Sequence, residues 1–148
     1  MLVPTKILVP VDFSAYSDKA LGQAFDIAKQ YKAKVYVLHV VHEKISRSID
    51  DYGLTPESIE GLDWKMMSAA KMKLEQHINK FPQTKELEVF NEVVLGNPSE
   101  EILKAQTEKG IDLIVIASLG RTGIAKYLIG SVARNILKGA KCPVLLTK

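Results

Sequence analysis

The chain has 148 residues, which suits a single domain, residues 1–148, with a sizeable core. Hydrophobic residues make up 47%, and the net charge of +3 is too small an excess to predict binding to nucleic acid. One cysteine excludes an intrachain disulfide, and no apolar run approaches the roughly 18 residues of a membrane span, so we expect a cytoplasmic protein without a membrane partner.

The first part of the chain alternates short apolar runs with a helical pattern. Residues 6–11 (KILVPV) predict a buried strand, which the following DFS ends. Apolar residues then recur at helical spacing as far as Tyr31, and Ser14 or Ser17 is expected to cap this helix. Residues 34–41 (KVYVLHVV) are apolar on both alternating faces, which is typical of a parallel strand covered by helices on both sides.

The middle of the chain predicts a loop over residues 42–54 and then a long helix, with Thr55 as its N-cap and Pro56 in its first turn. The helix extends to about Phe81. The residues expected to face inward are Ile59, Leu62, Met66, Ala69, Ala70, Leu74, Ile78 and Phe81. Core packing is also the default interpretation for Trp64, Met66, Met67 and Met72, with a partner surface as the alternative.

The last part of the chain continues the alternation of strands and helices. Residues 87–94 predict a third strand, and Asn97 is expected to cap a helix that Gly110 ends. Residues 111–117 predict the fourth strand. A short helix closed by a glycine separates it from the fifth strand, residues 143–147 (PVLLT).

Five strands alternating with four helices predict an α/β fold, an open parallel sheet with helices on both faces. In such sheets ligands bind beyond the carboxyl ends of the strands, where the strand order reverses. With the order 3-2-1-4-5, the reversal lies between the first and fourth strands. This arrangement places Asp12 beside the loop that contains Gly120.

The loop after the fourth strand, residues 117–132 (ASLGRTGIAKYLIGSV), has the composition of a phosphate site. Gly120 and Gly123 allow backbone N–H groups to approach a ligand. Gly130-Ser131 precedes the last helix, where Ser131 is expected to be the N-cap and the helix dipole favours an anion. The alternative is that these glycines are only turn residues.

Four segments now carry a resemblance to a known family. VPVDFS, VLHVV, GNPSEEIL and GRTGIAKYLIGSVARNILKGAKCPVLL resemble, in this order, the universal stress protein family, over almost the whole chain. The resemblance implies a Rossmann-like α/β fold that is usually dimeric. One branch of the family binds ATP and another does not.

The ATP-binding branch has a glycine, two residues, a second glycine, nine residues, and then glycine with serine or threonine. Gly120 and Gly130-Ser131 match its second and third parts. Ala117 replaces the first glycine, and Leu119 stands where histidine is common. We expect the methyl group of Ala117 to crowd a ribose, and so to weaken the site without blocking it.

The resemblance implies that Pro10 and Asp12 contact base and ribose, and that Val40 meets adenine through its backbone. The implied nucleotide-binding residues are Pro10, Val11, Asp12, Val40, Ala117, Ser118, Gly120, Arg121, Gly130, Ser131 and Val132, with Ala117 and Ser118 at the sugar and the last five at the phosphates. A turn residue is the alternative for Asp12, and a solvated cation is the alternative for Arg121.

The sequence lacks the motifs of several other binding sites and catalytic sites. No P-loop occurs, and the first strand is not followed by the dinucleotide-binding glycines. His39, His42 and His77 lack metal-ligand spacing, and His39 is expected to be a core histidine with a satisfied ring. Ser131 has no evident base, and Cys142 is expected to be a small buried residue.

The leading functional hypothesis is a stress-response protein that binds ATP or AMP, with Mg²⁺ as a candidate accompanying ion. Binding would serve as a signal or a protective function, with at most slow ATP hydrolysis. A homodimer is expected through strand 143–147, whose edge position leaves free backbone groups. The alternatives are an interaction module of the same fold that binds no nucleotide, and a phosphotransfer enzyme.

Overall fold

The centre of the fold is a five-stranded parallel sheet. The computed structural model describes residues 1–42, 56–120 and 129–148. The strands are β1 (Lys6–Pro10), β2 (Lys34–His42), β3 (Val89–Gly96), β4 (Leu113–Ala117) and β5 (Val144–Thr147). Their order is β3-β2-β1-β4-β5, and every neighbouring pair is parallel. The predicted α/β fold and its 3-2-1-4-5 order are therefore confirmed.

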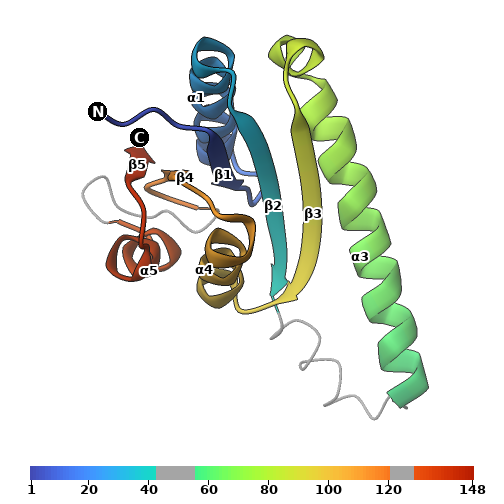
Figure 1. Ribbon diagram of the computed structural model, residues 1–148. Coiled ribbons are helices and arrows are strands. Elements are labelled where there is room, and N and C mark those ends of the chain that lie inside the picture. Colours follow the sequence, from blue (N-terminus) through green and yellow to red (C-terminus); the bar gives the residue numbers. More distant parts are fainter. Residues whose placement is uncertain (43–55, 121–128) are drawn as a thin grey trace.

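Helices cover both faces of this sheet (Figure 1). The helices are α1 (Ala15–Tyr31), α3 (Pro56–Asn79), α4 (Pro98–Lys109) and α5 (Ser131–Gly139), and a 3₁₀ turn, η1, spans Pro82–Glu86. The buried side chains form two clusters: α1 and α3 pack on one face, and α4 and α5 pack on the other. Among the described residues, no helix is both long and apolar enough to cross a membrane.

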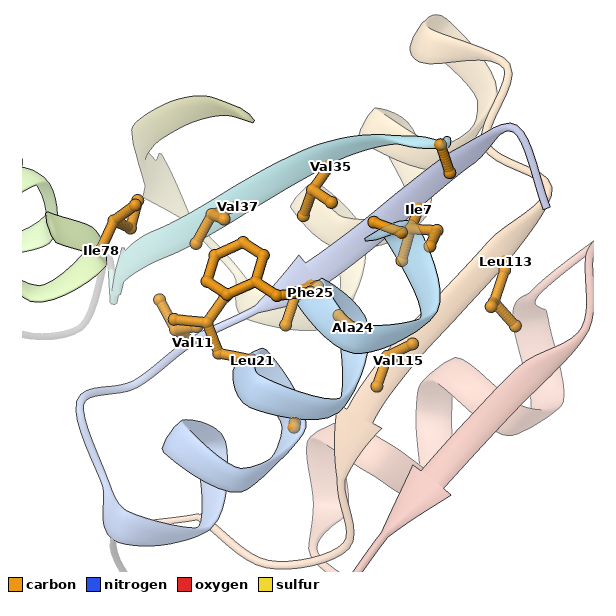
Figure 2. Packing of buried hydrophobic residues seen from close by; sticks show 14 of the residues in the cluster. Ile7, Val11, Leu21, Ala24, Phe25, Val35, Val37, Ile78, Leu113 and Val115 are labelled. Atoms are coloured by element: carbon orange, nitrogen blue, oxygen red, sulfur yellow. The ribbon is translucent and has the colours of Figure 1, made fainter. Parts of the chain in front are cut away.

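The cluster under α1 is built around Phe25 (Figure 2). Phe25 and Leu21 of α1 are completely buried, and Val35 and Val37 of β2 meet them from the sheet. The ring of Phe81 closes this cluster at one end, with its centroid 5.4 Å from that of Phe25. Burial of these apolar groups is the main favourable contribution to the fold on this face.

Two helices begin and end as the sequence predicts. The Ser14 side chain accepts a hydrogen bond from the N–H of Ser17 and so caps α1. The Asn97 side chain accepts from the N–H of Glu100 and caps α4. At the other end of α4, Gly110 has a φ of 64°, a left-handed conformation that glycine adopts without steric cost.

Several predicted boundaries shift by a few residues. The helix predicted to reach Phe81 ends at Asn79, and η1 delays the third strand from 87 to 89. The fourth strand begins at 113 instead of 111, and the fifth begins at 144 instead of 143. The residue before each strand already hydrogen-bonds to the neighbouring strand, through the carbonyls of Glu88 and Pro143 and the N–H of Asp112.

The prediction that Trp64 and Met72 pack in the core is wrong, since they are 71% and 63% exposed. Ala69 is also exposed, whereas Leu74 and Ile78 are buried as predicted. The first turns of α3 extend past the carboxyl ends of β2 and β3 (Figure 1), so only the later turns have a sheet to cover. The predicted loop over 42–54 starts one residue later, because His42 ends β2. The rest of this loop, the predicted cap Thr55 and the side chain of Ile59 lie outside the described residues.

Replacing Phe25 by alanine should lower the free energy of unfolding by about 3–5 kcal/mol, because the core loses both buried area and packing contacts. Denaturant unfolding monitored by circular dichroism measures this change. Trp64→Ala is the matched control, since an exposed side chain should change stability by less than about 0.5 kcal/mol. Equal losses in the two variants would contradict this description of the core.

Candidate functional site

A cavity of about 270 Å³ opens at the carboxyl ends of β1 and β4. The chain leaves β1 toward α1 on one face of the sheet and leaves β4 toward α5 on the other face. The two connections diverge, and the space between them is where ligands bind in sheets of this type. The cavity is lined by Pro10, Val11, Asp12, Ser17, Leu38, Val40, Pro98, Ile102, Ile116, Ala117, Ser118, Leu119, Gly120, Gly130, Ser131, Val132 and Ala133.

Of the residues that the sequence suggests for a nucleotide site, all but one line this cavity. The exception, Arg121, lies outside the described residues. Three separate segments of the chain therefore meet at one place: the end of β1, β2 near Val40, and the connection from Ala117 to Val132. The roles of the individual side chains toward a ligand remain predictions.

Sequence reasoning missed most of the apolar wall. Leu38, Ile102 and Ile116 line the cavity and belong to the buried cluster under α4 and α5. A signal was present for Leu38, which stands two residues before Val40 and so shares its side of β2. Pro98 and Ile102, four residues apart on α4, could not be placed without knowing which face that helix covers.

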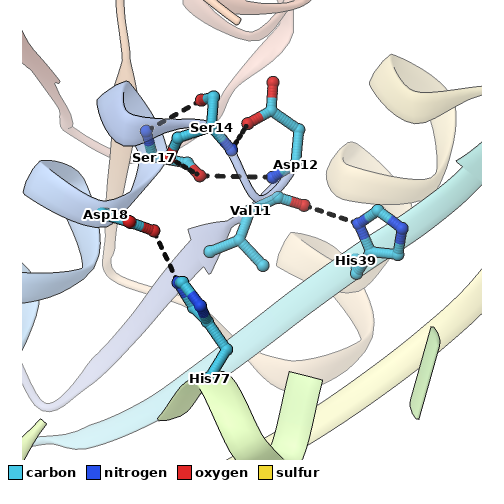
Figure 3. Close-up of polar contacts among 7 residues, drawn as sticks. All are labelled: Val11, Asp12, Ser14, Ser17, Asp18, His39 and His77. Atoms are coloured by element: carbon cyan, nitrogen blue, oxygen red, sulfur yellow. Dashed lines mark hydrogen bonds and ion pairs between the residues drawn. The ribbon is translucent and has the colours of Figure 1, made fainter. Parts of the chain in front are cut away.

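The polar end of the cavity begins with a tight turn after β1 (Figure 3). The Asp12 carboxylate accepts a hydrogen bond from the N–H of Ser14 at 3.0 Å. The N–H of Asp12 donates to Oγ of Ser17 at 3.4 Å, and this hydroxyl donates to the carbonyl of Ser14 at 3.0 Å. Ser17 is 97% shielded from solvent. Its role here is to hold the turn, so Ser14 is the helix cap of the two candidates.

Gly120 lies directly against the Asp12 carboxylate. A Cβ atom at position 120 would stand 2.7 Å from Oδ2 of Asp12, closer than side chains approach one another. The loop after β4 therefore meets the turn after β1 without a side chain between them. Close approach of backbone to ligand is the usual reason for glycine at such a position.

The start of α5 closes the cavity on the opposite side. Gly130 is the N-cap residue, and its N–H donates to the carbonyl of Ser118 at 2.7 Å. The prediction that Ser131 caps the helix is wrong: Ser131 is the first helical residue, and no side chain makes a cap hydrogen bond. The first-turn amides of α5 still lack acceptors within the helix, and the helix dipole adds partial positive charge there.

Ala117 lines the cavity and also contributes to the buried core. It is the last residue of β4, and its side chain packs in the cluster under α1, with Val115 two positions earlier. The backbone therefore needs no glycine here, since positive φ angles occur among described non-glycine residues only at Phe13 and Lys32. This packing argues against the expectation that the methyl group crowds a ribose, which stays a prediction that nucleotide binding by Ala117→Gly tests.

The histidines close to this site have structural partners. Nδ1 of His39 lies 2.8 Å from the carbonyl oxygen of Val11, which satisfies the ring as predicted, although His39 is half-buried rather than buried. His42 ends β2, and His77 lies 2.5 Å from Oδ1 of Asp18. Within the described part of the chain, no group of three His, Cys, Asp or Glu residues could hold a metal ion.

Cys142 has no properties of a catalytic nucleophile. It is half-buried, not fully buried as predicted, and lies just before β5, away from the residues that line the cavity. Burial raises the pKa of its thiol, and the negative charge of Asp112 raises this pKa further. The reactive thiolate is therefore less populated at neutral pH than in a free cysteine.

Comparisons with known proteins identify the family of the chain. The sequence model of the Universal stress protein family matches residues 4–148. The chain belongs to the universal stress protein family. Universal stress protein MJ0531 of Methanocaldococcus jannaschii is 33% identical over 97% of this chain and 81% of that protein, and MJ0577 of the same organism is 33% identical over 97% and 94%.

Solved structures of the family share the whole fold. The structure of MJ0577 has a TM-score of 0.84, with 31% identity over 99% of this chain and 97% of that chain. A universal stress protein in complex with cAMP has a TM-score of 0.67. The universal stress protein from Archaeoglobus fulgidus in complex with dAMP has a TM-score of 0.61. The cAMP complex is 20% identical and covers 99% of this chain and 98% of its own. The dAMP complex is 23% identical and covers 99% of this chain and 100% of its own. At these identities the two structures show the fold alone.

The different caps of α4 and α5 can be tested by mutation. Asn97→Ala should lower the free energy of unfolding by about 1 kcal/mol, because the N–H of Glu100 loses its acceptor. Ser131→Ala should change it by less than about 0.5 kcal/mol, because Ser131 makes no cap hydrogen bond. Denaturant unfolding of both variants measures this, and a larger loss for Ser131→Ala would restore serine as the cap.

Proposed function

We propose that this universal stress protein binds an adenine nucleotide, ATP or AMP, in the cavity between β1 and β4. The observation that carries the proposal is the make-up of this cavity. One end has apolar walls, and the other has glycines and the start of a helix. A nucleotide needs both environments in one crevice, because its base is flat and apolar and its phosphate is an anion.

In this proposal the adenine lies at the apolar end, against Leu38, Val40 and Ile102. These residues offer apolar side chains, so polar recognition of the base falls to the backbone near Val40. The ribose lies beside Asp12, whose carboxylate accepts hydrogen bonds from hydroxyl groups. The phosphate lies at the first turn of α5, where amides and the helix dipole stabilise negative charge.

The likeness to the cAMP and dAMP complexes supports the proposal at the level of the fold, because it shows that this architecture accommodates adenine nucleotides. The cavity walls offer no metal cluster among the described residues. In the proposal, a Mg²⁺ ion therefore arrives with ATP and is held mainly by its phosphates.

We further propose that the bound nucleotide acts as a cytoplasmic signal in a stress response, with at most slow hydrolysis. Ser131, the hydroxyl closest to the proposed phosphate, is exposed and starts a helix. Hydrolysis would require a base that activates water next to the phosphate. Neither His39 nor His77 lines the cavity, and Asp12 is the only carboxylate among its described lining residues.

Gly130→Val should abolish nucleotide binding, while Gly130→Ala should retain most of it. A Cβ atom at 130 would lie 3.4 Å from the Ser118 carbonyl oxygen, an ordinary contact, whereas the extra methyl groups of valine would press on the backbone of 118–120. Calorimetry with ATP and AMP measures binding. No binding by the wild-type protein at millimolar nucleotide would favour the interaction module without nucleotide.

Ala117→Gly should leave nucleotide affinity within about twofold of wild type and lower stability by about 1 kcal/mol. The methyl group contributes to the cluster under α1, and glycine weakens a strand. Calorimetry and denaturant unfolding on the same sample separate the two effects. Much tighter binding by the glycine variant would show that the alanine does crowd the ligand.

We also propose a homodimer through β5. This strand is the last in the sheet order, so one of its sides faces no further strand among the residues that the structure describes. Leu145 is 38% exposed, whereas Leu146 is half-buried toward the cluster under α5. Antiparallel pairing of two such strands about a two-fold axis would satisfy both edges and cover Leu145.

Leu145→Lys should convert this dimer to monomers, because pairing would bring two buried charges together. Sedimentation velocity at micromolar concentration measures the mass. Leu137→Lys, an equally exposed leucine on α5, is the matched control and should leave the dimer intact. A wild-type protein that sediments as a monomer would refute the arrangement.

A further inference from the structure

Phe13 has an unusual backbone conformation beside the cavity. Its φ is 64°, in the left-handed region that bulky side chains disfavour. Lys32, the other described non-glycine residue with positive φ, is the C-cap of α1, where this conformation is common. A helix C-cap does not explain the positive φ of Phe13, because Phe13 lies in the turn between β1 and α1. Strained residues persist only where surrounding contacts hold them, and they cluster at functional sites.

Contacts from two distant elements hold the Phe13 ring. The centroid of the His39 ring on β2 lies 4.5 Å away, and the His77 ring on α3 meets it edge-on at 5.8 Å. The ammonium of Lys73, one turn earlier on α3, lies 4.4 Å from the ring centroid, a cation–π geometry. His77 is itself fixed by its contact with Asp18 in the first turn of α1 (Figure 3).

The conformation of Phe13 determines where the preceding side chain lies. The left-handed turn brings the N–H of Ser14 back to the Asp12 carboxylate. The other oxygen of this carboxylate then lies directly against Gly120. A change of φ at Phe13 would break the first contact and swing the carboxylate, because only one residue separates the two groups.

We infer that Phe13 is a positioning residue for Asp12, and that α3, through Lys73 and His77, controls the geometry of the nucleotide cavity. The inference rests on the proposed function and deepens it. The ring does not line the cavity, so its effect on a ligand passes through the carboxylate. Displacement of the last turns of α3 would release Phe13 and lower the affinity for nucleotide.

Three substitutions at Phe13 separate positioning from simple packing. Phe13→Tyr keeps the ring and should bind AMP as wild type does. Phe13→Gly deletes the side chain but still allows positive φ, whereas Phe13→Val excludes this conformation. We expect Val to weaken AMP binding about tenfold and Gly by less, although Gly removes more packing. A role in packing alone predicts the reverse order, and that result would overturn the inference.

NMR titration with AMP measures these affinities into the millimolar range, and thermal unfolding confirms that each variant is folded. In an Asp12→Ala background, which removes both carboxylate oxygens, Phe13→Val should change the Kd by less than about twofold, since the two residues act as one unit. Independent, multiplicative losses would overturn the inference while leaving the proposed function intact. No AMP binding by the wild-type protein would contradict the proposed function and this inference with it.

The contribution of α3 is tested by Lys73→Met, which keeps the methylene stem and removes the charge over the ring. Loss of the cation–π contact should weaken AMP binding by about two- to fivefold. Lys71→Met, an exposed lysine on the same helix, is the control for the loss of one positive charge and should have no effect. Equal effects of the two lysine variants would show that general electrostatics, not Phe13, connects α3 to the site.

Discussion

The divergence of the chain after β1 and β4 is the constraint on which the site depends. In a parallel sheet, right-handed crossovers require that connections running in opposite directions use opposite faces. α1 therefore covers one face and α5 the other, and no helix can fill the space between the two strand ends. The cavity follows from topology before any side chain is chosen. Side chains then decide which ligand it can hold.

Close approach of backbone segments gives this cavity its polar end. Gly120 comes so near to Asp12 that a methyl group would not fit, and the N–H of Gly130 reaches the Ser118 carbonyl. The first contact joins the loop after β4 to the turn after β1, and the second holds the start of α5, which lines the cavity, close to the end of β4. The strained backbone at Phe13 belongs to the same arrangement, and the packing of β2 and α3 around its ring stabilises it.

The sequence predicted what local chemistry determines. The cap Asn97, and the choice of Ser14 or Ser17 for the first helix, follow from patterns within short segments. The meeting of Asp12 with the glycine loop follows from the alternation of strands and helices together with the 3-2-1-4-5 strand order. The sequence could not predict what depends on distant contacts. Phe13 gives no signal of positive φ, since residues about sixty positions later hold it there. Trp64 is exposed because the first turns of α3 extend beyond the sheet. Ser131 is the first residue of α5, one position after the N-cap Gly130.

The central claim is that the cavity formed by this divergence is a nucleotide site. A crystal structure of the wild-type protein grown with saturating AMP tests this claim most directly. We expect the adenine between Leu38 and Ile102, the ribose at Asp12, and the phosphate at the first turn of α5. Nucleotide bound elsewhere on the protein, with this cavity closed or empty, would contradict it.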